Sequence, residues 1–325
     1  MHKVQGISHG LGGKPAGQAM AGGGLRRAAQ RLGCVLIGLV LTACGSLQST
    51  KPQEPSSPPT AERREVRLGL ALGGGAARGF AHVGVIQVLE EAGLRPSHVV
   101  GTSAGSLVAA LYASGKNPAE LVRVAETMQE AEITDWMLPI LNRGALRGEA
   151  LAKYVNTQVG GKTLEQMQIP LGVVATDLAS GQAITFRRGN TGAAVRASSA
   201  VPAVFQPVRL GDREYVDGGL VSPVPVRQTR EMGANFVVAV DISSDPEGNP
   251  YGDTFQILMQ TFAIMGKSIN TLALKEADLV IRPALSGVKS ADFSARLRAI
   301  EAGRVAMRAA LPALKARMAQ FEEGR

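Results

Sequence analysis

Ser103 lies between Gly101 and Gly105, at a point where an extended segment meets a helical one. Residues 97–100 have extended character, and residues 104–113 are small, apolar and typical of a helix. A G-x-S-x-G turn between a strand and a helix exposes the serine hydroxyl at the helix N-terminus, where the helix dipole favours negative charge. The pattern predicts a nucleophilic Ser103, and a simple tight turn is the alternative.

A serine nucleophile needs a base beside it, because a free hydroxyl attacks poorly. The chain has four histidines, His2, His9, His82 and His98, and all of them precede Ser103. The chain order of serine, acid and then histidine is therefore excluded. His82 lies within a predicted helix among apolar residues, so we interpret it as a packing residue.

Three carboxylates remain as candidates for the base. Asp217 follows a short strand-like segment and precedes Gly218 and Gly219, which permit positive φ angles and close backbone approach. Partial burial would raise the pKa of such a carboxyl group toward the range useful to a general base. Asp177 and Asp241 also lie at strand ends, and the residues alone do not rank the three.

A glycine-rich loop, LGGGAARG, leaves the first predicted strand over residues 72–79. Backbone amides in such a loop at a helix N-terminus bind anions. A dinucleotide site is disfavoured, because both G-x-G-x-x-G reading frames lack one glycine and no acidic residue follows at the end of a second strand. No Gly-Lys-Ser/Thr follows either, which excludes a Walker A loop. The remaining interpretation is an oxyanion hole, which needs two or three converging amides.

Apolar strands alternate with helical segments from Val66 onward, which predicts a three-layer α/β domain around a mostly parallel sheet. The continuous apolar runs at 170–177 and 235–242 are suited to central parallel strands. The other predicted strands are 67–72, 97–100, 182–187, 214–216 and 278–282. Helices are predicted at 77–92, 104–113, 118–130, 149–159, 254–276 and 293–321.

The three motifs, taken in their order along the chain, resemble those of the patatin-like phospholipase family. The glycine-rich loop comes first, then the turn at Ser103, then Asp217 with its two glycines. Supporting matches are the segments 174–178, 197–202 and 217–225, and the resemblance covers about residues 67–282. It implies a patatin-like α/β/α fold and a Ser–Asp dyad, with Ser103 as nucleophile, Asp217 as general base and lipid acyl esters as substrates.

The resemblance also implies an oxyanion hole at Gly74, Gly75 and Ala76, with Arg78 beside them and Gly79 closing the motif. Many family members carry glycine where this chain has Ala76. An alanine keeps the backbone amide but would be strained at a positive φ. The loop geometry is therefore the feature in which this sequence departs from the family pattern.

Residues 1–43 have the features of an export signal. A basic region with three arginines precedes the apolar run 33–43, which is too short to span a bilayer. This run ends in Leu-Thr-Ala-Cys44, which resembles the lipobox of bacterial lipoproteins and implies lipidation of Cys44. A plain signal peptide is the alternative, and translation is expected to start at Met1 or at Met20.

Residues 45–65 are rich in proline, serine and charge, which predicts an extended tether between Cys44 and a domain at 66–325. The lipidated cysteine would attach the protein to a membrane. Because no aspartate follows the cysteine, lipoprotein sorting patterns suggest the periplasmic face of the outer membrane.

The leader also accounts for much of the charge. It holds five basic residues and no acidic one, so its removal lowers the formal net charge from +8 to +3. A nucleic-acid partner is therefore not predicted. The only other cysteine, Cys34, lies in the leader, so the mature domain has no disulfide and no thiolate metal site. Neither a metal nor a cofactor is predicted.

The predicted function is hydrolysis of carboxylic esters of lipids through an acyl-enzyme, with a membrane lipid or lysolipid as substrate. A non-catalytic, membrane-tethered binding protein on the same fold is the rival from another class. Acyl transfer or thioester hydrolysis is a third possibility. The apolar run Trp136–Leu141 is interpreted as a buried segment or as a lid over the site. The sequence does not specify the head group, the acyl chain or the oligomeric state.

Overall fold

The computed structural model describes residues 64–135, 144–249, 251–289 and 291–324. The predicted leader, Cys44 and the run Trp136–Leu141 lie outside these described residues.

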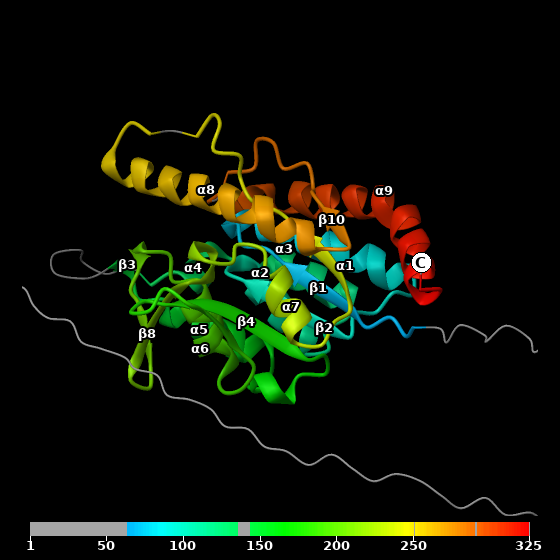
Figure 1. The fold of residues 1–325 in the computed structure, drawn as a ribbon. Coiled ribbons are helices and arrows are strands. Elements are labelled where there is room, and N and C mark those ends of the chain that lie inside the picture. Colours follow the sequence, from blue (N-terminus) through cyan, green and yellow to red (C-terminus); the bar gives the residue numbers. More distant parts are fainter. Residues whose placement is uncertain (1–63, 136–143, 250, 290, 325) are drawn as a thin grey trace, which may run out of the picture. The chain divides into compact units, whose positions relative to one another are not determined.

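A central sheet is built from β1 (Leu68–Leu72), β2 (His98–Thr102), β4 (Leu171–Asp177), β5 (Ala183–Phe186), β7 (Val208–Leu210), β8 (Arg213–Asp217), β9 (Phe236–Val240) and β10 (Leu279–Ile281). Its order is β10-β9-β1-β2-β4-β8-β7, with β5 also paired to β4 (Figure 1). The strands from β10 to β4 run parallel, whereas β5, β7 and β8 join by antiparallel pairs. The predicted α/β fold with a mostly parallel sheet is confirmed.

The helices of the described chain are α1 (Phe80–Glu91), α2 (Ala104–Ala113), α3 (Pro118–Thr127), α4 (Glu130–Ile133), α5 (Glu149–Gln158), α6 (Thr191–Ser198), α7 (Val226–Glu231), α8 (Thr254–Ala273) and α9 (Arg296–Glu322). Alternate residues of β1 show that helices cover both faces of the sheet. Leu70 and Leu72 lie in a core cluster with residues of α1, α2 and α9, whereas Ala71 packs with Val226 of α7. Every residue of β1 is buried, as expected for a strand between two helical layers.

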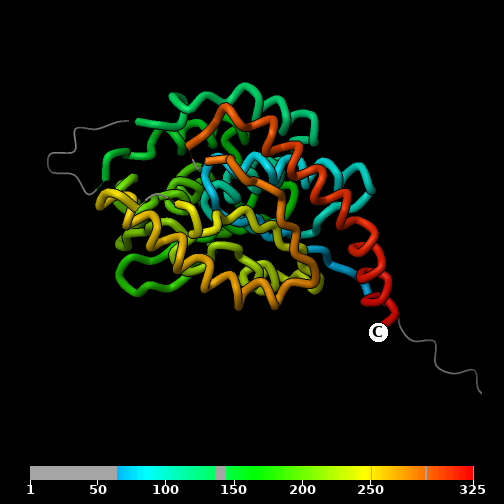
Figure 2. Tube along the Cα trace, turned by 90° about the horizontal axis from the view of Figure 1, so that it is seen from above, coloured from blue at the N-terminus to red at the C-terminus, as the bar shows by residue number. Residues whose placement is uncertain are grey.

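Helices α1 and α9 cross at a pair of glycines. A Cβ on Gly84 would lie 2.0 Å from the carbonyl oxygen of Ile300, and a Cβ on Gly303 would lie 2.0 Å from that of Ala81. The two backbones are therefore in direct contact, and Figure 2 shows α9 running beside α1. Any side chain at either glycine would force the helices apart, because a packed core has little room to adjust.

Some predicted helices differ at their ends. Residues 76–79 form a 3-10 turn, η1 (Ala76–Gly79), before α1 begins. The predicted helix 118–130 stops at Thr127, because the Glu132 side chain accepts a hydrogen bond from the Gln129 amide and caps a new helix, α4. The elements that the sequence did not predict are short: α6, α7, β7, β3 (Gly144–Leu146) and β6 (Ala203–Phe205).

Helix α8 lies largely outside the core. Asn270 is its only buried residue, whereas Phe255, Ile257 and Ile264 are each more than half exposed. Lys267 is the only charged residue in the helix. Among the described helices, the stretch Thr254–Glu276 is the one long and apolar enough to cross a membrane, with a mean hydropathy of 1.2. The inner side of α8 contacts the turn η3 (Gly218–Leu220), which follows β8.

Candidate active site

Ser103 occupies a strained turn between β2 and α2. Its φ and ψ are 52° and −124°, a conformation that residues with a side chain rarely adopt. The neighbouring glycines provide room rather than unusual φ angles. A Cβ on Gly105 would lie 2.2 Å from the carbonyl oxygen of Leu72, and one on Gly101 would lie 2.4 Å from that of Gly105. The turn can therefore pack closely against β1, and the strain falls on the serine.

The backbone of Ser103 is held on both sides. Its amide donates a 2.8 Å hydrogen bond to the hydroxyl oxygen of Ser198, and its carbonyl accepts one of 2.6 Å from the hydroxyl of Ser106. The preceding residue, Thr102, donates its hydroxyl to the carbonyl of Ser222 at 2.9 Å. These contacts fix the serine in a conformation that the backbone alone would not favour.

Asp217, at the end of β8, is the carboxylate that the structure brings to Ser103. The Gly219 amide donates a 2.7 Å hydrogen bond to it, and the Ser103 hydroxyl interacts with it and lowers its pKa. The Asp217 residue is 6% exposed. Burial raises the pKa of Asp217 to about 6, against the opposing effects of the Ser103 hydroxyl and the Gly219 amide. The carboxylate is thus charged at neutral pH and basic enough to accept a proton.

Neither of the two glycines after Asp217 has a positive φ. Their role is close packing. A Cβ on Gly218 would lie 2.2 Å from the carbonyl oxygen of Val174, and one on Gly219 would lie 2.9 Å from the Asp217 carboxylate. Of the two properties that glycine permits here, the structure uses close approach and not a positive φ. The backbone of β4 requires glycine at position 218, and the Asp217 carboxylate limits the side chain at position 219.

The two competing carboxylates have other partners. Asp177 is paired with Arg213 at 2.9 Å and accepts hydrogen bonds from the amides of Ala179 and Ser180. These donors lower the pKa of Asp177 to about 2. Asp241 is paired with Arg282 at 3.1 Å and also accepts a hydrogen bond from the Ser243 hydroxyl. Both carboxylates therefore fit a structural role better than that of a base.

The amides at the start of the glycine-rich loop donate backbone hydrogen bonds, and the two that follow find no backbone acceptor in the described part of the chain. The Gly74 amide donates to the carbonyl of Pro223 at 2.9 Å, so it is not available to an oxyanion. The amides of Gly75 and Ala76 have no backbone acceptor among the described residues. Ala76 has a φ of 50°, the strained conformation that an alanine at this position would adopt if the loop kept its family geometry. Two of the three predicted donors are thus free to bind an anion.

Arg78 and His82 contact the carbonyl oxygens of this loop with buried side chains. The Arg78 side chain is buried and directs its Nε at the carbonyl of Gly75, at 3.4 Å. His82 is fully buried, and its Nε2 lies 2.8 Å from the carbonyl oxygen of Gly73. Burial lowers the pKa of His82 to about 4, so the ring is neutral and donates through Nε2. The predicted packing role of His82 is confirmed, with loop support added to it. Gly79 permits close contact, since its Cβ would lie 2.8 Å from that of Ala104.

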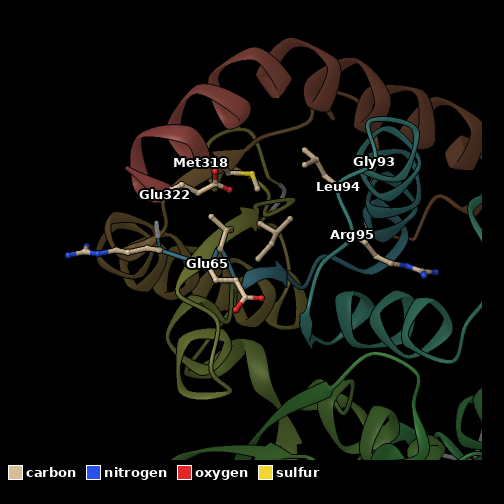
Figure 3. Close-up of a pocket in the computed structure, with 9 residues that line it drawn as sticks. Glu65, Gly93, Leu94, Arg95, Met318 and Glu322 are labelled. Atoms are coloured by element: carbon tan, nitrogen blue, oxygen red, sulfur yellow. The ribbon is translucent and has the colours of Figure 1, made fainter. Parts of the chain in front are cut away.

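An apolar pocket of about 250 Å³ opens beside Ser103 and Ala76. Its walls come from α1, α2, α3 and β6, and include Val83, Leu111, Leu121, Met128 and Phe205. A second hollow, of about 540 Å³, lies at the start of β1 and shares no lining residue with the first. Figure 3 shows its lining, where Glu65, Arg95 and Glu322 place charges around Leu94 and Met318. Of these two hollows, only the first has Ser103 in its lining.

Within the described ranges, no group of three or more histidine, cysteine, aspartate or glutamate side chains could hold a metal ion. The site therefore consists of a serine, a carboxylate, a loop with free amides and an apolar pocket. Sequence reasoning did not assign a role to Ser198, Thr176 or Pro223, which contact the site residues. Thr176 was the one with a local signal, because its hydroxyl follows the continuous apolar run of β4.

Fold and site together define an α/β protein with a serine at a strained turn between a parallel strand and a helix. Residues 70–230 match the patatin-like phospholipase family, and the chain belongs to that family. An uncharacterized NTE family protein of Mycobacterium bovis is 37% identical over 183 residues, which are 56% of this chain and 51% of that protein. Patatin-like phospholipase domain-containing protein 6 of Mus musculus is 31% identical over 196 residues, 58% of this chain and 14% of that protein.

The chain spans about half the length, or less, of these curated relatives. Among solved structures, VipD from Legionella pneumophila has a similar fold, with a TM-score of 0.53 and 17% identity. The match covers 77% of this chain and 68% of VipD. At this identity the likeness concerns the fold alone.

Proposed function

We propose that the protein is a serine acyl hydrolase that cleaves carboxylic esters of lipids. The observation that carries the proposal is the placement of Ser103, on a strained turn, beside the buried carboxylate of Asp217, whose pKa the Ser103 hydroxyl lowers. Membership of the patatin-like phospholipase family supports a lipid as substrate. The raised pKa of Asp217 supports its role as general base, because a base works best with a pKa near the working pH.

In the proposed reaction, Asp217 accepts the hydroxyl proton of Ser103 while the serine oxygen attacks the ester carbonyl carbon. The amides of Gly75 and Ala76 donate hydrogen bonds to the oxyanion that forms. The tetrahedral intermediate then breaks its ester C–O bond, and Asp217 returns the proton to the leaving alcohol. Water attacks the acyl-serine with Asp217 again as base, which releases a fatty acid and restores Ser103.

The pocket beside Ser103 supports an acyl chain as the group that is transferred to the serine. Its lining is almost entirely aliphatic or aromatic, and Ser103 is one of its few polar members. Burial of a chain methylene in such a pocket contributes about 0.8 kcal/mol. The pocket would therefore bind the acyl part of the ester and leave the alcohol part outside.

The test is covalent labelling with a fluorophosphonate, together with hydrolysis of acyl nitrophenyl esters of increasing chain length. Ser103→Ala is expected to abolish both, and Ser268→Ala, on the exposed side of α8, is a matched control that should keep both. A folded protein that is neither labelled nor active would contradict the proposal and favour a non-catalytic binding protein. Activity that survives in Ser103→Ala would move the nucleophile elsewhere.

We further propose that Cys44 is lipidated and anchors the domain through residues 45–65 to a membrane, at the periplasmic face of the outer membrane. The lipobox-like run that ends at Cys44 is the support for this proposal. Metabolic labelling with a radioactive fatty acid should mark the parent and Cys34→Ser, but not Cys44→Ser. Equal labelling of the two variants would refute the anchor without affecting the proposed hydrolase.

A further inference from the structure

Strand β4 lies between the two strands that carry the proposed dyad. Thr102, the residue before the nucleophile, pairs with Val174 in parallel register, and Asp217 pairs with Ala175 in antiparallel register. Ser103 and Asp217 are far apart in the chain, so their separation depends on what joins β2 and β8 across β4. Two buried hydroxyl groups make this connection.

Ser198, the last residue of α6, is one of them. Its hydroxyl oxygen accepts a 2.8 Å hydrogen bond from the Ser103 amide, and the same hydroxyl donates a 2.5 Å hydrogen bond to the carbonyl of Val174. Ser198 is 0% exposed, so water cannot replace either hydrogen bond. One side chain thus ties the strained turn at Ser103 to β4.

Thr176 supplies the second connection, on the side of Asp217. Its hydroxyl donates to the Asp217 carbonyl at 2.8 Å, and the Asp217 amide donates to the carbonyl of Ala200 at 2.9 Å. Ala200 lies two residues after Ser198. The end of α6 therefore contacts the backbone of both dyad residues.

We propose that Ser198 is a positioning residue, which holds the Ser103 hydroxyl at the Asp217 carboxylate by fixing the backbone amide of Ser103. The inference rests on the proposed function. A residue at positive φ persists only where its surroundings over-determine it, and the Ser103 amide donates its hydrogen bond to the Ser198 hydroxyl. Without the Ser198 hydroxyl, the turn relaxes and the serine oxygen moves away from its base.

Substitution by alanine and by cysteine tests the proposal. Ser198→Ala removes the hydroxyl, whereas Ser198→Cys keeps nearly the same volume and offers a weaker hydrogen-bond partner. The matched control is Ser114→Ala, since Ser114 is also a buried serine and donates its hydroxyl to the carbonyl of Leu111 at 2.7 Å. It loses an equivalent hydrogen bond at a place remote from the dyad.

We expect Ser198→Ala to lower kcat and the fluorophosphonate labelling rate by about 10–100-fold, the usual cost of a misplaced reacting group. The kcat and labelling rate of Ser198→Cys should lie between those of Ser198→Ala and the parent. The KM of either variant should differ little from that of the parent. The Ser103 hydroxyl lowers the pKa of Asp217, so its displacement should also move the kinetic pKa upward. Ser114→Ala should change none of these quantities, even if it unfolds more easily.

Hydrogen–deuterium exchange of the peptide 101–107 provides a readout that does not depend on activity. Ser198→Ala should speed exchange there, and Ser114→Ala should not. Unchanged kcat, or unchanged exchange in this peptide, overturns the positioning role. If the parent itself is inactive and unlabelled, the proposed function fails, and the exchange measurement alone then decides whether Ser198 holds the turn.

Discussion

Asp217 and Asp177 lie at the ends of two paired strands, and their surroundings move their pKa values in opposite directions. Asp217 ends β8 and has a pKa raised to about 6 by burial, whereas Asp177 ends β4 and has a pKa lowered to about 2. Both are almost fully buried by neighbouring groups. Burial is the largest effect on the pKa of Asp217, which has one amide donor and the Ser103 hydroxyl beside it. Hydrogen bonds are the largest effects on the pKa of Asp177, whose donors are Arg213 and two backbone amides.

Asp217, the proposed base, differs from Asp177 in having no arginine among the groups that shift its pKa. A cation beside Asp217 would satisfy the charge and remove its basicity. The groups that shift the pKa of Asp217 include no cation, and one of them is the Ser103 hydroxyl, which can give up its proton. The same residue type, at the same kind of position, becomes structural as soon as an arginine and two amides reach it.

The largest expected effect is on activity. Asp217→Asn should lower kcat by about 10²–10⁴-fold, the usual contribution of a general base, whereas Asp177→Asn should retain most of the activity of its folded fraction. Hydrolysis of a nitrophenyl ester, normalised to folded protein by circular dichroism, measures this. A larger loss of kcat in Asp177→Asn than in Asp217→Asn would assign the role of base to Asp177.

The second expected effect is on the pH dependence of acylation. Only charged Asp217 can accept the serine proton, so the labelling rate should fall about tenfold for each pH unit below the pKa of about 6. A base with the pKa of Asp177 would instead give a flat profile down to about pH 3. Labelling rates between pH 4.5 and 8 distinguish the two, with protein re-tested at pH 7.5 to exclude acid inactivation.

The third expected effect concerns stability. The folded pKa of Asp217 lies above its unfolded value of 3.8, so the charged carboxylate destabilises the folded state. This destabilisation is complete above about pH 6 and absent below about pH 4, where the group is protonated in both states. A difference of about two in pKa corresponds to at most about 3 kcal/mol. Asp217→Asn should therefore melt at a higher temperature than the parent at pH 7.5 and at the same temperature near pH 4.

Asp177→Asn is the opposite case in the same measurement. Its folded pKa lies below 3.8, so its charge stabilises the fold above about pH 4, and this contribution is lost as the pH falls toward 2. The variant should melt at a lower temperature than the parent at pH 7.5. Equal melting temperatures for the two variants at that pH would contradict the contrast between the carboxylates.

The smallest expected effect follows from Arg213→Gln. The arginine is more than half exposed, so water screens its attraction for Asp177. Removing it should lower the melting temperature slightly at pH 7.5 and leave the kinetic pKa of about 6 unchanged. A shift of that kinetic pKa would mean that Arg213 also acts on Asp217.

The fold was predictable where apolar runs were long. The runs at 170–177 and 235–242 became β4 and β9, and the predicted helices 104–113 and 149–159 were found within a residue of their bounds. The short strands β3, β6 and β7 contain three residues each, which is too few to show a period. They depend on pairing across the chain, which a local pattern does not contain.

The candidate site was predictable as a set of motifs, and its internal arrangement was not. Local sequence singled out Ser103 and left three aspartates open, because the partners of a carboxylate come from distant segments. Ser198 reaches Ser103 from another helix, and Pro223 takes up the Gly74 amide from another loop. Only the folded chain shows which amides remain free for an oxyanion.

The crossing of α1 and α9 at Gly84 and Gly303 bears on how the protein is made. The loop that carries Ala76 leads directly into α1, and α9 is translated after both residues of the proposed dyad. Until residues 296–322 have left the ribosome, α1 has no backbone to pack against at Gly84. The backbone contact that α1 makes at Gly84 therefore forms only after both Ser103 and Asp217 have been synthesised.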